Sequence, residues 1–206
     1  TIPTEGVLNP QEGTVECWAY VNPDIHKQGS AWNMIFVVTD SNEANQLRFG
    51  YSRVSGKWHV KTTNSAGAAW YAEFTVSSGW HYFALTWNQS TTTAKMYVDG
   101  IIVAQKTSAP LPSAFASTAR IGSWLSSAYV FNSLIDDLRF SNRARTDAEI
   151  LAAYQSGQPL QKDEYTTYLM PFNGSIYPVE QCWVPLGTFW SLDWDSPDDS
   201  LEATVT

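Results

Sequence analysis

The feature that most constrains the fold is an alternation of apolar and polar residues that recurs in short runs along most of the chain. Alternation with a period of two is typical of a β-strand that buries one face. Turn signals separate the runs, as in "YVDGII", where Asp99 and Gly100 favour a tight hairpin. Ten runs are predicted strands: 14–21, 33–40, 45–52, 57–63, 69–76, 79–88, 93–99, 101–106, 117–123 and 131–141. Strands this short and this numerous predict an all-β fold, a two-sheet antiparallel jelly-roll sandwich.

One stretch, "RTDAEILAAYQSG", predicts a short helix over 146–156. Thr146 can cap its N-terminus, and Glu149 stands three residues later, so the two residues can form a capping box. Gly157 suits the left-handed residue that ends many helices. A helix of this length is unstable alone, so its apolar stripe, which includes Ile150, must dock on the sandwich. We expect the helix to plug an open end of the sandwich.

Composition narrows the range of partners. The chain has 206 residues, a net charge of −8 and no cluster of lysine or arginine. It therefore offers no basic groove for nucleic acid and no patch for an anionic membrane. No apolar run approaches the ~18 residues that insertion across a membrane requires. Tryptophan and tyrosine are abundant, with ten of each. So many rings in a polar, acidic chain favour a module that stacks on neutral sugars, and an aromatic core is the alternative.

Four stretches, in order, resemble the laminin G-like jelly roll of the concanavalin A-like lectin/glucanase fold. They are "GTVECWAYVNP", "GWHYFALTWN", "KMYVDGIIV", and "IGSW" followed by "LIDDLRFSNRARTDAEI", and together they span residues 13 to about 155. The resemblance implies two curved antiparallel sheets. It also implies a carbohydrate- or protein-binding module of a secreted or surface protein. Some members of the family hold calcium, and some relatives are glycoside hydrolases.

The resemblance divides the chain into a sandwich domain over 1–158 and a C-terminal extension over 159–206. Family members often start with a strand of the type "YLLHFDGS" ahead of the "GTVECW" strand, and here only "YLMPFNGS" at 168–175 has that character. The extension either returns to complete the sandwich or begins a following β module. Cys17 is in register with core residues, and two cysteines leave open whether it is bridged to Cys182.

The pattern of carboxylates disfavours catalysis. Hydrolases of this superfamily carry carboxylates at alternate positions of one strand, and glycoside hydrolysis needs two carboxyl groups ~5 Å or ~6.5–9.5 Å apart. The nearest approximation is Asp193 with Asp195, which lie in the tail beside a proline turn. His26, His59 and His81 stand without a serine or cysteine partner in a motif. The sequence therefore predicts that the chain is not an enzyme.

Asp136 is the candidate metal ligand. In "LIDDLRF" the alternation puts Asp136 on the same face as Leu138 and Phe140, which have the character of core residues. A buried carboxylate needs hydrogen-bond donors or a cation. Because some members of the family hold calcium, we expect a structural Ca²⁺ at Asp136, completed by backbone carbonyls. The alternative is a structural hydrogen bond to a loop, helped by Arg143 or Arg145.

Several aromatic side chains are candidates for stacking on a sugar. Trp18 and Tyr20 lie opposite the apolar face of their strand, and Tyr71 also faces away from the core. Trp32 precedes a strand and Trp124 follows one, positions that suit platforms at loop tips. A flat ring with one or two fixed polar groups is the minimum sugar site. The alternative for Trp18 and Tyr20 is that the tail strand or the docked helix covers them.

Arg48 and Arg139 lie on polar strand faces and could form paired hydrogen bonds to hydroxyls or to an acidic sugar. The leading hypothesis is a non-catalytic, lectin-like module that binds a glycan or polysaccharide. It would sit beside neighbouring domains in a larger extracellular, cell-surface or virion protein. The alternatives are a structural or protein-interaction domain of a surface or phage tail protein and, less favoured, a glycoside hydrolase.

Overall fold

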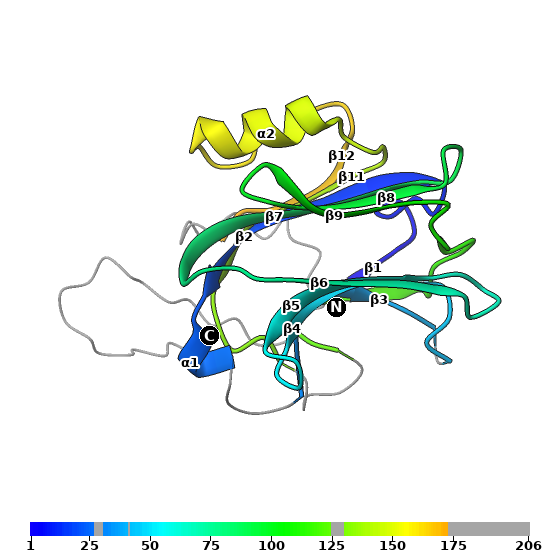
Figure 1. Ribbon diagram of the computed structural model, residues 1–206. Helices are drawn as coiled ribbons and strands as arrows, with labels where there is room; N and C mark the ends of the chain where they lie inside the picture. The colour runs from blue at the N-terminus through cyan, green and yellow to red at the C-terminus, as the bar shows by residue number, and fades with distance from the viewer. Residues whose placement is uncertain (27–30, 41, 125–129, 173–206) are drawn as a thin grey trace, which may run out of the picture. The chain divides into compact units, whose positions relative to one another are not determined.

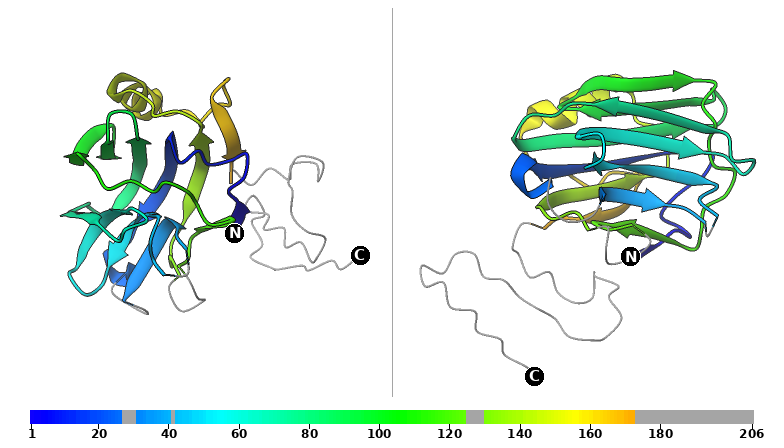
Figure 2. Two further views of the ribbon diagram at one scale, coloured as in Figure 1. Left: turned by 90° about the vertical axis from the view of Figure 1, so that its right-hand side faces the viewer. Right: turned by 60° about the horizontal axis from the view of Figure 1, so that its bottom comes forward.

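The computed structural model describes residues 1–26, 31–40, 42–124 and 130–172. Residues 1–171 form one compact unit. Two antiparallel sheets of six strands face each other (Figures 1 and 2). The predicted all-β sandwich is therefore confirmed.

Both sheets combine strands that are distant in the sequence. Sheet A pairs, in spatial order, β1 (Ile2–Pro3), β10 (Thr118–Ile121), β3 (Trp32–Val38), β4 (Gln46–Ser52), β5 (Lys57–Thr63) and β6 (Ala69–Phe74). Sheet B pairs β12 (Thr166–Met170), β11 (Ile135–Ser141), β2 (Glu12–Val21), β7 (Gly79–Asn88), β8 (Thr93–Val98) and β9 (Ile101–Thr107). Each predicted strand is present, and the described residues add β1, β12 and a short helix, α1 (Pro23–His26).

Strand β12 comes from the predicted C-terminal extension and pairs with β11. The pairing places β12 at the edge of sheet B. Residues 173–206 lie outside the described residues. The boundary at residue 158 and the role of the remaining tail stay predictions.

The core lies between the sheets and is filled by alternate residues of each strand. Aromatic rings from opposite sheets meet there: the ring centroid of Phe83 lies 4.8 Å from that of Trp58 and 6.3 Å from that of Phe49. Cys17 is completely buried among these residues and has no disulfide partner within the described part of the chain; burial raises the pKa of its thiol. Cys182 lies outside the described residues, so a bridge between the two cysteines is untested.

Helix α2 (Asp147–Ser156) begins with the predicted capping box. The Thr146 hydroxyl accepts a hydrogen bond from the backbone N–H of Glu149, and the Glu149 carboxylate accepts one from the N–H of Thr146. Gly157 ends the helix in the left-handed conformation, with φ of 56°. Both ends of the helix are thus set by local chemistry that the sequence displays.

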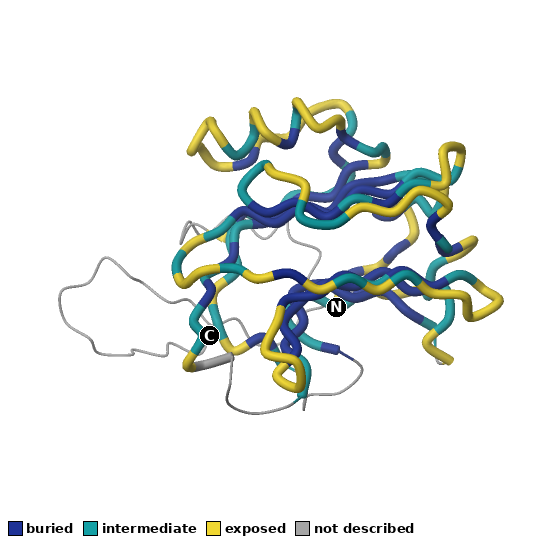
Figure 3. Tube along the Cα trace, in the orientation of Figure 1, coloured by how far each residue is buried: buried dark blue, intermediate teal, exposed yellow. Residues whose placement is uncertain are grey.

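The helix lies across the outer face of sheet B and does not plug an end of the sandwich (Figures 1 and 3). Its Ile150 is completely buried against Tyr82, Ala84 and Tyr97, which project outward from β7 and β8. The expected position was wrong because these apolar side chains make the outer face of sheet B a second surface in need of cover. The helix therefore covers part of the outer face of sheet B.

Candidate functional site

The outer face of sheet A gathers aromatic and basic side chains from neighbouring strands. In β4, Leu47 and Phe49 point into the core, so Arg48 between them points outward. In β5, His59 likewise stands between core residues, and in β6 so does Tyr71. Strands β4, β5 and β6 are adjacent in the sheet, so these three side chains lie side by side on its outer face.

These side chains and two tryptophans form a continuous row. The guanidinium carbon of Arg48 lies 5.1 Å from the centroid of the Trp32 ring and 4.4 Å from that of Trp124. The Trp32 ring meets His59 edge-on, with centroids 5.0 Å apart. The imidazole of His59 stacks on Tyr71 at 5.4 Å with an interplanar angle of 24°. We call these five residues the aromatic–basic row; four of them, all except His59, are predicted ligand-binding residues that the fold brings together.

The row runs from a buried end to an open end. Arg48 is 4% exposed and His59 is completely buried, whereas Tyr71 is 42% exposed. Among the residues that the structure describes, Nε and Nη1 of Arg48 and both ring nitrogens of His59 have no hydrogen-bond partner, and the same holds for the side-chain amide of Gln46. An unpaired buried polar group costs ~1–3 kcal/mol. The row therefore holds unused polar groups beside flat rings.

Burial and neighbouring charge set the protonation states along the row. Burial, followed by the charges of Arg48 and Lys61, lowers the pKa of His59 to about 3, so its imidazole is neutral at pH 7. Burial also lowers the pKa of Arg48 from its ordinary value. Burial and a 2.9 Å hydrogen bond donated to Glu73 raise the pKa of Tyr71 to about 12. The row thus presents one cation, a neutral imidazole and a neutral phenol.

Trp18 and Tyr20 lie on the other sheet. The Trp18 ring packs 5.5 Å from Tyr82 and 5.9 Å from Tyr154 of helix α2, so the helix covers it. The expectation that this face stays open at Trp18 is wrong, and the covered alternative applies. Tyr20 is half-buried and meets Trp80 edge-on at 5.7 Å. Neither residue contributes to the aromatic–basic row.

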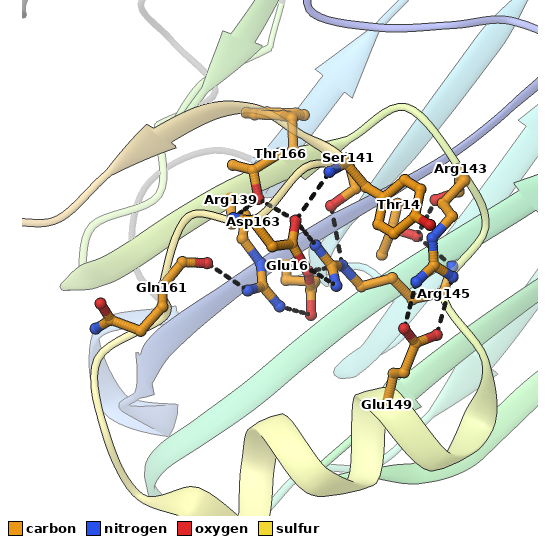
Figure 4. A network of polar contacts seen from close by, with 12 residues as sticks. Thr14, Glu16, Arg139, Ser141, Arg143, Arg145, Glu149, Gln161, Asp163 and Thr166 are labelled. Atoms are coloured by element: carbon orange, nitrogen blue, oxygen red, sulfur yellow. Dashed lines mark hydrogen bonds and ion pairs between the residues drawn. The ribbon is translucent and has the colours of Figure 1, made fainter.

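Arg139 is buried in an ion-pair network and does not lie on an open polar face (Figure 4). Its Nε and Nη2 donate to Glu16 at 2.8 and 3.0 Å, and its Nη1 donates to the carbonyl of Gln161 at 2.8 Å. Arg145 also approaches Glu16, at 3.2 Å, and donates to Asp163 at 2.9 Å. Each guanidinium nitrogen of Arg139 is thus occupied, so the expectation that it is available to a sugar is wrong.

A β-bulge changes the direction of Asp136. The register between β11 and β2 shifts after Asp136, and Asp137 has a positive φ of 49°. Asp136 pairs opposite Trp18, which faces helix α2, whereas Leu138 faces the core. The expectation that Asp136 shares a face with Leu138 is wrong, because the bulge adds one residue and resets the alternation.

The described surroundings of Asp136 do not by themselves make a calcium site. One oxygen of Asp136 accepts the N–H of Asp137 at 2.8 Å, and one oxygen of Asp137 accepts the N–H of Leu160 at 3.1 Å. Within the described residues no group of three or more His, Cys, Asp or Glu side chains could hold a metal ion. Calcium usually takes six to eight oxygen ligands. Calcium at Asp136 stays a prediction.

His59 and Gln46 belong to the outer face of sheet A but were not among the expected site residues. The signal for His59 was present, because "KWHVK" places it between two apolar residues. Gln46 directly precedes Leu47, a core residue, so the sequence also indicated that the Gln46 side chain points outward. The alternation does not reveal the order of the strands in the sheet, and this order is what places His59 and Gln46 beside Arg48.

A family model described as the concanavalin A-like lectin/glucanases superfamily matches residues 1–151. This range contains most of the stretches that carry the resemblance seen in the sequence. A comparison with curated protein sequences finds no match.

Several solved structures share the fold. A candidate carbohydrate-binding protein from Bacteroides ovatus is 18% identical, with a TM-score of 0.60, over 80% of this chain and 46% of its own. The CBM40 of the Ruminococcus gnavus IT-sialidase is 13% identical, with a TM-score of 0.54, over 72% of this chain and 84% of its own. The binding domain of botulinum neurotoxin serotype G is 14% identical, with a TM-score of 0.51, over 75% of this chain and 39% of its own. The chain spans less than half of the first and third proteins, and at these identities the likeness concerns the fold alone.

Proposed function

Because the chain belongs to the concanavalin A-like lectin/glucanases superfamily, we propose that it is a non-catalytic module that binds a glycan on the outer face of sheet A. The observation that carries the proposal is the aromatic–basic row. It joins four neighbouring strand positions and a loop residue into one continuous row of rings and unused polar groups, which is largely buried at Arg48 and His59 and exposed at Tyr71.

The row has the chemistry that a sugar requires. A pyranose presents an apolar C–H face to a flat ring, and its hydroxyls need fixed donors and acceptors nearby. Tyr71 is the exposed ring, and its hydroxyl is held by Glu73 at 2.9 Å. Lys57 lies 3.8 Å from the same carboxylate, so the open end of the row is polar as well as aromatic. A sugar that stacks on Tyr71 would therefore meet hydrogen-bonding groups at its edge.

Two similar structures support carbohydrate binding, since one is described as a candidate carbohydrate-binding protein and another as a CBM40 of a sialidase. The likeness to a toxin binding domain supports an extracellular or surface setting, as part of a larger protein. Neither helix in the described part of the chain has the length and apolarity of a membrane span.

The distribution of carboxylates supports a binding role over hydrolysis. The strands of sheet A contain one acidic residue, Glu73, and it is bonded to Tyr71. Glycoside hydrolysis commonly needs two carboxyl groups across the scissile bond. Asp193 and Asp195, the pair considered from the sequence, lie outside the described residues.

The proposal is tested by glycan-array and affinity-electrophoresis binding of the purified chain. Replacing Tyr71 with Ala removes the exposed ring, and base or sugar stacking of this kind is worth ~1–3 kcal/mol, so affinity should fall about tenfold or more. The matched control is Trp80→Ala, an exposed ring on sheet B, which should leave binding unchanged. Binding that survives Tyr71→Ala but is lost in Trp80→Ala would move the site to sheet B and overturn the proposal.

A second function, protein interaction, is favoured by apolar side chains exposed on sheet B. Trp80 is 45% exposed and meets Tyr20 edge-on, and Leu134, whose carbonyl accepts the N–H of Tyr20, is exposed as well. Exposed apolar groups of this size mark contact surfaces when they cluster. If no glycan binds and Trp80→Ala weakens association with a neighbouring domain of the parent protein, this second function replaces the first.

A further inference from the structure

We infer that the glycan bound on sheet A is acidic, and that Arg48 with Lys61 forms the subsite for its carboxylate. The inference rests on the proposed function and adds the class of sugar to it.

Sheet A concentrates positive charge in an acidic protein. The chain as a whole carries a net charge of −8. The strands of sheet A nevertheless contain four basic side chains and a single acidic one, Glu73; the basic residues are Arg48, Lys57, Lys61 and Arg120. A positive surface on an acidic protein attracts anionic ligands, although the net negative charge of the chain as a whole does not.

Two of these cations face each other directly. Arg48 on β4 and Lys61 on β5 are register partners, so their side chains project from the same face of the sheet. Like charges placed opposite each other across two strands are destabilising. Within the described residues Lys57 pairs with Glu73, whereas Arg48 and Lys61 form no ion pair; the Glu43 carboxylate acts on both only from beyond ion-pair distance. An anion held between the two would remove this repulsion.

The guanidinium of Arg48 is positioned but not satisfied. Trp32 and Trp124 hold it by cation–π contacts at 5.1 and 4.4 Å, and it is 4% exposed. Its Nε and Nη1 find no acceptor among the described residues. The buried Arg139 shows the contrast, because Glu16 and a backbone carbonyl take up all of its nitrogens. Burying a charge without an anionic partner is costly, and a carboxylate is the acceptor that guanidinium binds most strongly.

Access to these nitrogens requires a movement. They are covered in the ligand-free chain, and Trp124 supplies part of the cover from a segment beyond β10. The carboxylate would reach Arg48 as the Trp124 ring turns aside. Binding of an acidic glycan should therefore change tryptophan fluorescence, and Trp124→Phe should reduce that change.

The test uses an array on which hexuronic-acid and nonulosonic-acid glycans are each printed beside their carboxyl methyl esters. The ester keeps the shape of the sugar and removes its charge. A charge-assisted hydrogen bond is worth ~1.5–3 kcal/mol, so the acid should bind about 10- to 100-fold more tightly than its ester. This preference should shrink as the ionic strength rises from ~0.05 to ~0.5 M.

Two variants locate the effect. Arg48→Gln should abolish the preference for the acid over the ester, whereas Arg53→Gln, which removes an exposed arginine just after β4, should keep it. Lys61→Gln should reduce the preference and weaken its dependence on salt. If Arg48→Gln fails to fold, Lys61→Gln and the comparison of acid with ester in the unaltered protein still test the preference for an acidic glycan.

The outcomes separate this inference from the proposed function. Equal binding of acid and ester, with binding still lost in Tyr71→Ala, overturns the acidic class and leaves the glycan-binding module standing. Absence of binding to every glycan overturns both. A preference for the acid that survives Arg48→Gln places the carboxylate elsewhere and reduces Arg48 to a structural cation between two rings.

Discussion

Glu16 illustrates how strongly a single residue can be committed to the fold. It is completely buried on β2, and its carboxylate is met by Arg139, by Arg145 and by the hydroxyl of Tyr82. The network joins β2 and β11 to the segment that carries Asp163 (Figure 4). A buried pair of this kind adds little net stability, but loss of one partner leaves an uncompensated charge.

Arg139→Met should therefore lower the free energy of unfolding by about 3 kcal/mol. The loss stays near the low end for a broken buried pair because Arg145 remains 3.2 Å from Glu16. The control is Lys95→Met, which breaks an exposed pair with Asp147 and should cost at most ~1 kcal/mol. Urea unfolding at pH 7 measures both values. Equal losses of unfolding free energy in the two variants would show that burial does not determine the cost of breaking an ion pair.

At the scale of elements, the position of helix α2 depends on the hairpin between β8 and β9. Gly100 in that hairpin has a φ of +76°, and a Cβ added to it would lie 2.8 Å from Cδ1 and 3.1 Å from Cα of Leu151 in the helix. Glycine is required here for two reasons, the left-handed backbone and the close approach of the helix. The hairpin and the helix are thus fitted to each other.

Gly100→Ala should destabilise the protein by about 2–4 kcal/mol, since the strain of the positive φ adds to the cost of overpacking. Gly67→Ala is the matched control. Gly67 has a φ of +81° but nothing within 4 Å of an added Cβ, so only the backbone strain of ~1 kcal/mol should appear. Thermal unfolding measures both. If Gly100→Ala is no less stable than Gly67→Ala, the close approach of the helix to the hairpin does not contribute to the cost.

At the scale of the whole molecule, the unpaired imidazole of His59 links stability to pH. A free histidine has a pKa of about 6.5, and burial with nearby positive charge lowers that of His59 to about 3. Between these values the unfolded chain binds a proton that the folded chain does not. Above pH 6.5, His59 therefore takes nothing from the free energy of unfolding. As the pH falls below 6.5, proton uptake by His59 in the unfolded chain lowers the free energy of unfolding by at most ~1.4 kcal/mol per pH unit.

His59→Phe should flatten the decline in stability between pH 6.5 and 5, because it removes the group that takes up the proton on unfolding. Urea midpoints at pH 7, 6 and 5 give the slope. Thr63→Val, a buried change without a titratable group on the same strand, should keep the decline of the unaltered protein. A slope unchanged by His59→Phe would mean that His59 is already protonated in the folded chain.

Sequence patterns predicted the features that depend on residues close together in the chain. Alternation located the strands, and the capping box at Thr146 located the helix. The face that α2 covers depends on side chains far apart in the chain, so the sequence did not reveal that Trp18 would be covered. The bulge at Asp137 depends on a left-handed backbone that alternation does not encode. Arg48 and Arg139 have similar settings in the sequence, and only the strand order separates an unpaired guanidinium from a fully bonded one.

Strands β1 and β12 occupy the same edge of the sandwich, because β6 and β9 contact each other at the opposite edge (Figure 2). The hydroxyl of Thr167 ties the two regions together by donating to the carbonyl of Val7 at 2.7 Å. The first and last strands of the unit formed by residues 1–171 are thus adjacent. In the larger protein proposed above, this adjacency would let the unit project sideways from the rest of the polypeptide.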